Sequence, residues 1–180
     1  MRVVAGTSRG RVLKAPRGGD IRPTADKVRE AIFDVLGGVV ELTGATVADL
    51  FAGSGAMGIE ALSRGAASVV FVDHSPVALR AVRQNLTAAG LDDAPTRIVR
   101  AEALRWLARP HAFDLALCDP PYAFDAWHEL LGRLRAAVAV LETDRPVDTP
   151  PTWEVIKRKR YGGTLVSVVR AVEPLQRGTS

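Results

Sequence analysis

Apolar residues follow two alternating patterns along the chain from about residue 24 onward. Short apolar runs of strand length are separated by segments in which apolar residues return at the spacing of a helix. The runs predict strands at Thr46–Phe51, Ser68–Asp73, Thr96–Ala101, Phe113–Cys118 and Val138–Glu142. Such alternation is typical of a mostly parallel sheet with helices on both of its faces.

Two of the predicted helices have recognisable ends. The first is expected to begin near Thr24 and to end at Gly37-Gly38. Its buried side is formed by Val28, Ile32, Val35 and Leu36. The second helix has Ser75 as its cap and Pro76 as its first residue, and Gly90 ends it.

The carboxyl-terminal part of the chain changes pattern. After Glu142 the segment TDRPVDTPP is rich in proline and polar residues and is predicted to be an exposed loop. Two extended runs, Trp153–Arg160 and Thr164–Arg170, then flank Gly162-Gly163 and predict an antiparallel hairpin. We therefore expect an α/β fold, a single Rossmann-like domain of the class I methyltransferase type. Its mostly parallel sheet ends in a C-terminal hairpin, which fits that type better than the simple dinucleotide-binding fold.

Composition favours one compact domain and excludes several classes of protein. The 180 residues are 47% hydrophobic, enough for one core, and no apolar run approaches the roughly 20 residues that span a bilayer. A single cysteine, Cys118, and three histidines predict neither a disulfide framework nor a metal site. We expect a cytoplasmic monomer without a metal ion and without membrane association.

Positive charge is concentrated at the amino-terminal end. Residues 1–30 hold eight basic and three acidic side chains, whereas the rest of the chain holds 16 basic and 17 acidic ones. We expect residues 1–23 to form a basic arm or hairpin appended to a domain of residues 24–180. Because basic groups that neutralise phosphates release counterions, this arm is a candidate RNA contact, and a solvated end that aids solubility is the alternative. The candidate RNA-binding residues are Arg2, Arg9, Arg11, Lys14 and Arg17.

A glycine-rich turn follows the first predicted strand. The run Asp49-Leu50-Phe51-Ala52-Gly53-Ser54-Gly55 continues to Gly58, and its glycines let the backbone turn tightly beside a ligand at the start of the next helix. This glycine spacing by itself also fits enzymes that bind a nicotinamide dinucleotide.

The charge of Asp49 favours a different cofactor. A carboxylate at this turn would repel the pyrophosphate of a dinucleotide, but it would attract the ammonium and sulfonium groups of S-adenosylmethionine. The alternative role of Asp49 is to cap a nearby helix. Asp73, which ends the second predicted strand, is the expected acceptor for the ribose hydroxyls.

The fourth predicted strand runs into Asp119-Pro120-Pro121-Tyr122. The two prolines remove backbone donors and stiffen the turn, so that the Asp119 side chain and the backbone carbonyls become fixed acceptors. Acceptors that hold the N–H groups of an exocyclic base amine direct its lone pair toward a methyl donor. Tyr122 offers a face for base stacking, and a Pro-Pro turn with Tyr122 as core is the alternative. Cys118 precedes the motif without a histidine partner and is expected to be core.

These motifs together resemble one protein family. The sequences MRVVAG, SRGR, RPTADKVREAIFDVL, DLFAGSGAMGIEALSRGA and DPPY are similar to those of the RsmD-type 16S ribosomal RNA guanine-N2 methyltransferases, over most of the chain up to about Glu142. The resemblance implies that S-adenosylmethionine is the methyl donor and that N2 of one guanine in 16S rRNA is the acceptor. It also implies that the partner is the small ribosomal subunit, with its rRNA and neighbouring ribosomal proteins.

The resemblance assigns residues to the site as well. The cofactor residues that it implies are Arg22, Pro23, Thr24, Asp49, Phe51, Ala52, Gly53, Ser54, Gly55, Asp73, Glu102 and Ala103. The guanine would be held by Asp119, Pro120, Pro121 and Tyr122. Many relatives carry Asp-Ala beside the cofactor's adenine, where this chain has Glu102-Ala103. The basic run Lys157–Arg160 could contact RNA or could protect the edge of the hairpin from strand addition.

Two other functions fit parts of the sequence. A nucleotide-dependent oxidoreductase would use the glycines at positions 53, 55 and 58 for a nicotinamide cofactor. A non-catalytic RNA-binding or assembly module would keep the fold and the basic arm without the chemistry.

Overall fold

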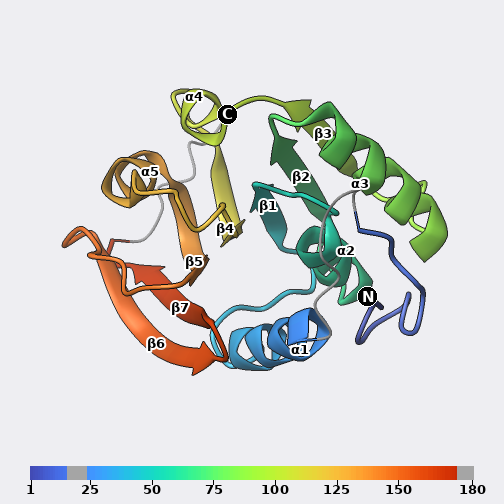
Figure 1. Cartoon of the computed structure of the whole chain (residues 1–180), viewed down its shortest axis with the longest axis horizontal. Helices are drawn as coiled ribbons and strands as arrows, with labels where there is room; N and C mark the ends of the chain where they lie inside the picture. Colours follow the sequence, from blue (N-terminus) through green and yellow to red (C-terminus); the bar gives the residue numbers. More distant parts are fainter. Residues whose placement is uncertain (16–23, 174–180) are drawn as a thin grey trace.

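A computed structural model describes residues 1–15 and 24–173 of the chain, and these residues form an α/β domain around a seven-stranded sheet (Figure 1). The strand order across the sheet is β3-β2-β1-β4-β5-β7-β6. The strands are β1 (Thr46–Leu50), β2 (Ser68–Asp73), β3 (Thr96–Arg100), β4 (Ala112–Cys118), β5 (Arg135–Thr143), β6 (Trp153–Tyr161) and β7 (Thr164–Ala171). The first five pair in parallel, and β7 is antiparallel to both of its neighbours. The predicted fold class, including the terminal hairpin, is confirmed.

Helices cover both faces of this sheet (Figure 1). They are α1 (Thr24–Leu36), α2 (Ala56–Ser63), α3 (Pro76–Ala89), α4 (Ala103–Trp106) and α5 (Trp127–Arg133). Side chains of α1, α2 and α3 share one apolar cluster with alternate residues of the strands, and α5 belongs to a second cluster on the opposite face. In β1, for example, Val47 belongs to the first cluster and Ala48 to the second, because successive strand residues point to opposite faces.

The sequence-predicted element boundaries agree closely with the structure. Helix α3 has Ser75 as its N-cap, whose Oγ accepts from the Ala78 N–H at 3.4 Å, and Gly90 ends it with a φ of 71°. Strand β5 begins at Arg135, three residues before the predicted start at Val138. The short helices α4 and α5 were not predicted, because four and seven residues are too few to establish a helical period.

The prediction that residues 143–151 form an exposed loop was partly wrong. Val147 is only 6% exposed and packs in the same apolar cluster as Trp127 and Trp153. A hydrogen bond of 3.2 Å from Arg158 Nη2 to the Val147 carbonyl fastens this part of the loop to β6. One apolar residue among prolines and acids is therefore enough to anchor the segment.

The described part of the amino-terminal segment is folded against the domain. Residues 1–15 double back with an antiparallel bridge between Arg2 and Val12, and Val3 and Leu13 are 2% and 1% exposed. The Asn85 side chain accepts from the Lys14 N–H and donates to its carbonyl, each at 2.8 Å. Residues 1–15 thus form a hairpin that contributes to the core in addition to carrying charge, and the expected boundary of the arm at residue 23 lies outside the described residues.

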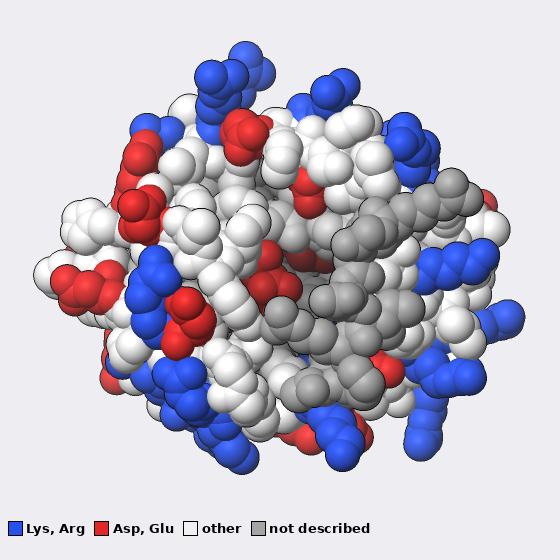
Figure 2. Space-filling model, viewed as in Figure 1, with Lys and Arg blue, Asp and Glu red and all other residues white. Residues whose placement is uncertain are grey.

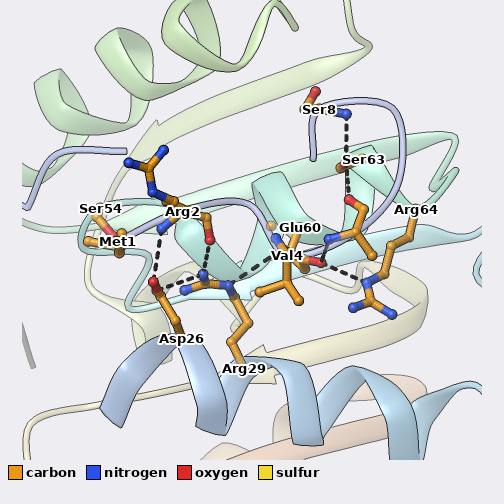
Figure 3. Close-up of polar contacts among 12 residues, drawn as sticks. Met1, Arg2, Val4, Ser8, Asp26, Arg29, Ser54, Glu60, Ser63 and Arg64 are labelled. Atoms are coloured by element: carbon orange, nitrogen blue, oxygen red, sulfur yellow. Dashed lines mark hydrogen bonds and ion pairs between the residues drawn. The ribbon is translucent and has the colours of Figure 1, made fainter. Parts of the chain in front are cut away.

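Glu60 of α2 is the main polar anchor of this segment (Figure 3). Its buried carboxylate accepts from the Val4 N–H at 2.8 Å and from the Ala5 N–H at 3.0 Å. The same carboxylate forms ion pairs with Arg29 of α1 at 3.5 Å and with Arg64 at 2.8 Å. The contacts with buried Arg29 and partly exposed Arg64 compensate the cost of burying the carboxylate, so the segment, α1 and α2 meet at one charged centre.

In the part of the chain that the structure describes, no helix combines the length and the apolar character needed to span a membrane. Among residues 1–15 and 24–173, no group of three or more His, Cys, Asp or Glu side chains could hold a metal ion.

Candidate functional site

A cavity of about 480 Å³ opens at the carboxyl ends of the parallel strands, where β1, β2, β4 and β5 finish. Figure 2 shows a hollow near the middle of this face with acidic side chains inside it, while Lys and Arg lie mainly toward the periphery. The lining residues are Met1, Arg29, Asp49, Phe51, Ala52, Gly53, Ser54, Ala56, Met57, Asp73, His74, Asp119, Pro120, Pro121 and Glu142. Both predicted motifs therefore meet in one cavity, as the carboxyl ends of neighbouring parallel strands require.

The glycine-rich turn between β1 and α2 has a backbone that only a few residue types tolerate. Gly53 and Gly55 have φ angles of 54° and 75°, and Phe51, which is not glycine, has a φ of 62°. A non-glycine residue in this region stores strain, which is found preferentially at functional sites. Gly58 serves packing instead, since a Cβ there would come within 2.4 Å of the Phe71 ring. Helix α2 can thus lie close to the sheet with its first amides at the cavity.

Asp49, the penultimate residue of β1, carries a buried carboxyl group and is only 3% exposed. Its Oδ2 accepts from the Gly58 N–H of α2 at 2.9 Å, so the helix contact that sequence analysis kept as an alternative exists alongside the position in the cavity. Burial, with smaller contributions from the nearby carboxylates of Asp119 and Asp73, raises the pKa of Asp49 to about 8, against the lowering effect of the Gly58 hydrogen bond. The cavity is therefore an environment in which an incoming positive charge is strongly favoured.

Asp73 connects the end of β2 to the glycine turn. Its Oδ2 accepts from the Gly53 N–H at 2.9 Å, and its Oδ1 accepts from the Ser75 N–H at 2.8 Å. Each carboxylate oxygen keeps a second lone pair, so the group can also accept from hydroxyls in the cavity. Its position at the strand end is the one expected for a ribose contact.

The segment after β4 is held from outside by the loop that follows β5. Arg145 donates to the Tyr122 carbonyl at 3.0 Å and to the Phe124 carbonyl at 3.3 Å. The Tyr122 hydroxyl lies 3.0 Å from Thr164 Oγ1 of β7, and the Tyr122 residue is 37% exposed. The Phe124 ring meets the strained Phe51 edge to face at 5.2 Å. These contacts fix the segment rigidly beside the glycine turn.

Two charged residues of the cavity were missed by sequence analysis. Arg29 reaches it from α1, held by Asp26 at 2.9 Å and by Glu60, and Glu142 reaches it from β5. Burial raises the pKa of Glu142 well above its usual range, the Asp119 and Asp49 carboxylates add to this, and Arg29 opposes it. Glu142 could have been found, because it ends a predicted strand at the same sheet edge as Asp119. Arg29 carries no such signal.

Several predicted site residues lie elsewhere or outside the described residues. Glu102 and Ala103 are not among the residues that line the cavity, although Glu102 directly precedes α4 near the end of β3. Thr24 opens α1, whereas Arg22, Pro23 and Arg17 fall outside the described residues. The remaining candidate RNA contacts, Arg2, Arg9, Arg11 and Lys14, are exposed on the amino-terminal hairpin.

Cys118 is core, as predicted. It is 1% exposed, and burial together with the Asp49 and Asp119 carboxylates raises the pKa of its thiol. A thiol in that environment stays protonated and is a poor nucleophile.

Comparisons with known proteins agree with this architecture. A family model described as Conserved hypothetical protein 95 matches residues 1–170. The ribosomal RNA small subunit methyltransferase D of Escherichia coli (strain K12) is 32% identical over 90% of this chain and 85% of its own length. The chain belongs to the RsmD-type methyltransferase family.

Two further relatives match nearly the whole of this chain. YlbH of Bacillus subtilis (strain 168) is 36% identical, and the match covers 94% of this chain and 98% of that protein. The solved structure of yhhF from Escherichia coli superimposes with a TM-score of 0.83 at 30% identity, covering 95% of this chain and 97% of the other. Membership of the family confirms the resemblance on which the sequence-based function rested, and the chain is a methyltransferase.

Proposed function

We propose that this protein transfers a methyl group from S-adenosylmethionine to the exocyclic N2 amine of a guanine in 16S rRNA of the small ribosomal subunit. The observation that carries the proposal is the meeting of Asp49, Asp73 and Asp119 in one cavity beside a glycine turn. The rRNA substrate is proposed from its relatives in Escherichia coli and Haemophilus influenzae, which are both named ribosomal RNA small subunit methyltransferase D.

The charges and hydrogen-bond acceptors of the cavity suit the proposed cofactor. S-adenosylmethionine supplies an electrophilic methyl group on a positively charged sulfur. The buried carboxyl group of Asp49 would attract this charge and the ammonium group of the cofactor. The Asp73 carboxylate can accept a hydrogen bond from a ribose hydroxyl. A dinucleotide would bring a negatively charged pyrophosphate to the same three carboxylates, which disfavours the oxidoreductase alternative.

The segment after β4 would organise the base. Asp119 and the backbone carbonyls around Pro120 accept the N–H groups of the amine, so that its lone pair is turned toward the methyl donor. The nitrogen that gains a methyl group loses one proton, for which the Asp119 carboxylate is a nearby acceptor. Tyr122, partly exposed at the rim, can stack on the extracted base.

The Asp119→Ala variant tests this assignment. We expect methylation to fall by about 100-fold or more, the scale of losing one preorganised electrostatic contact, with S-adenosylmethionine affinity nearly unchanged. Transfer of labelled methyl groups to small subunits from cells that lack the protein measures the first quantity, and calorimetry measures the second. Asp125→Ala, an exposed acid in the same segment that does not line the cavity, is the matched control. Unchanged turnover in Asp119→Ala would remove this residue from the mechanism.

The same preparations separate the alternative functions. Mass spectrometry of 16S rRNA before and after the reaction should locate one new N2-methylguanine. Calorimetry with NAD and NADP should detect no tight binding. Tight binding of either would favour an oxidoreductase, and salt-sensitive rRNA association without any methyl transfer would favour a binding module.

A further inference from the structure

Glu142 lies beside Asp119 at the end of the neighbouring strand. Strands β4 and β5 pair in parallel with Cys118 opposite Leu141, so the next residue of each chain segment emerges at the same edge of the sheet. Glu142 lines the main cavity with Asp119, and it also lines the smaller adjoining space bounded by Pro121 and Tyr122. It therefore stands where the cofactor cavity meets the proposed base position.

The Asp119 segment cannot by itself decide which base is methylated. Adenine, cytosine and guanine all carry an exocyclic amine, and acceptors for N–H groups suit each of them. The bases differ at the ring nitrogen beside the amine. Guanine has a hydrogen on N1, whereas adenine N1 and cytosine N3 each present a lone pair. A second acceptor next to the amine site would thus accept from guanine and repel the other two.

We propose that Glu142 selects guanine. While Asp119 accepts from the N2 amine of the base, the Glu142 carboxylate accepts a hydrogen bond from its N1–H. A base with a lone pair at that ring position is repelled by the same carboxylate. This inference rests on the proposed function. An ionised carboxylate is required, since it is then an acceptor only. Burial and the Asp119 and Asp49 carboxylates raise the pKa of Glu142 well above its usual range, and Arg29, which lines the same cavity, opposes them. The ionised form therefore depends on the positively charged methyl donor bound in the cavity, which favours it.

The test replaces the target guanosine with 2-aminopurine riboside in small subunits rebuilt from 16S rRNA, once the methylated position has been located by mass spectrometry. This analogue keeps the amine at C2, lacks the oxygen at C6 and therefore has a lone pair at N1. We expect the wild-type protein to methylate guanine at least about 100-fold faster than the analogue. The analogue leaves the Glu142 carboxylate without its hydrogen bond, and a site built for such a bond rejects a substrate that lacks it by at least this factor.

The Glu142→Gln variant should shrink this preference by about tenfold or more, since its amide can donate to the N1 lone pair. Each variant gives a ratio of the two rates, and comparing that ratio between variants cancels the different intrinsic reactivity of the two amines. Glu129→Gln, an exposed glutamate on α5 outside both cavities, is the matched control and should keep the wild-type ratio. Melting temperature and S-adenosylmethionine affinity, measured for every variant, show that the fold and cofactor site persist.

The outcomes are distinct. A smaller guanine preference in Glu142→Gln with intact cofactor binding supports the selection. An unchanged preference while the wild type methylates guanine overturns the selection and leaves the proposed function standing. Absence of guanine methylation by the wild type overturns both. Glu142→Ala provides a second variant, which should lose the preference without gaining activity on the analogue.

Discussion

At the scale of single residues, the site depends on carboxyl groups whose environment favours a positive ligand. Asp49 is the clearest case, because burial raises its pKa to about 8 and the neutral form therefore predominates at neutral pH while the cavity holds no cation. A cationic ligand stabilises the ionised form, so binding must be coupled to loss of a proton. The helix bond from Gly58 keeps the carboxyl group in place in either state.

This coupling predicts the pH dependence of cofactor affinity. S-adenosylmethionine should bind more tightly as pH rises toward about 8, the pKa of Asp49, and the affinity should level off above it. Calorimetry between pH 6 and pH 9, in buffers of different ionisation enthalpy, would measure both affinity and proton release. Glu142, whose pKa is also raised, lies in the same cavity, so Asp49→Asn is the necessary comparison. That variant should bind more weakly at high pH and with a flatter profile, and an identical profile would exclude Asp49 as the coupled group.

At the scale of elements, the amino-terminal hairpin is joined to the site through the helices. Glu60 of α2 binds its backbone, and Asn85 of α3 binds Lys14 while donating to the Ser54 carbonyl of the glycine turn at 2.9 Å. Close approach of the hairpin to α2 also requires Gly6. Its φ is 80°, and a Cβ there would lie 1.7 Å from the Ser63 carbonyl oxygen.

Gly6→Ala should therefore destabilise the protein more than Gly10→Ala. Gly10 has nearly the same φ, 83°, but a Cβ there would meet no atom within 4 Å, so the two variants share the backbone strain and differ in the clash. We expect the free energy of unfolding, measured by urea denaturation, to fall further in Gly6→Ala by about 1–3 kcal/mol. Equal losses would mean that the hairpin does not pack on α2 in solution.

At the scale of the whole molecule, acidic side chains lie inside the cavity, while Lys and Arg lie mainly toward the periphery of the same face, together with further Asp and Glu (Figure 2). Part of the basic run on β6 is engaged in structure, because Arg158 binds Ser167 and Val147, and Arg160 binds the Asp144 carbonyl at 3.2 Å. The exposed cations of the amino-terminal hairpin are thus the better candidates for phosphate contacts.

Replacing Arg9, Arg11 and Lys14 together with Ala should weaken binding to small ribosomal subunits and reduce its salt dependence by about one unit of log-log slope for each lost phosphate contact. Cofactor affinity should not change, since none of the three lines the cavity. Filter binding over a range of KCl concentrations gives the slope. Replacing Arg97, Arg105 and Arg109, which are also exposed, with Ala removes the same charge elsewhere and is the matched control. If both triple variants had the wild-type slope, the hairpin cations would serve solubility instead.

The sequence by itself determined those features that depend on residues close together in the chain. Strand runs, the caps of α3, the glycine turn and the Asp119 segment are local patterns, and the rule that parallel strand ends share one edge was enough to bring Asp49 and Asp119 together. Membership of a known family followed from the same short motifs.

Only the tertiary structure decided which distant groups surround those motifs. Arg29 enters the cavity from α1, Arg145 fixes the segment after β4, and Glu60 anchors a hairpin more than fifty residues away in the chain. Val147 is buried although its neighbours are polar. Such contacts leave no regular pattern in the sequence. The free energy that selects them comes from packing and from the pairing of buried charges, which depend on how the elements lie around the sheet.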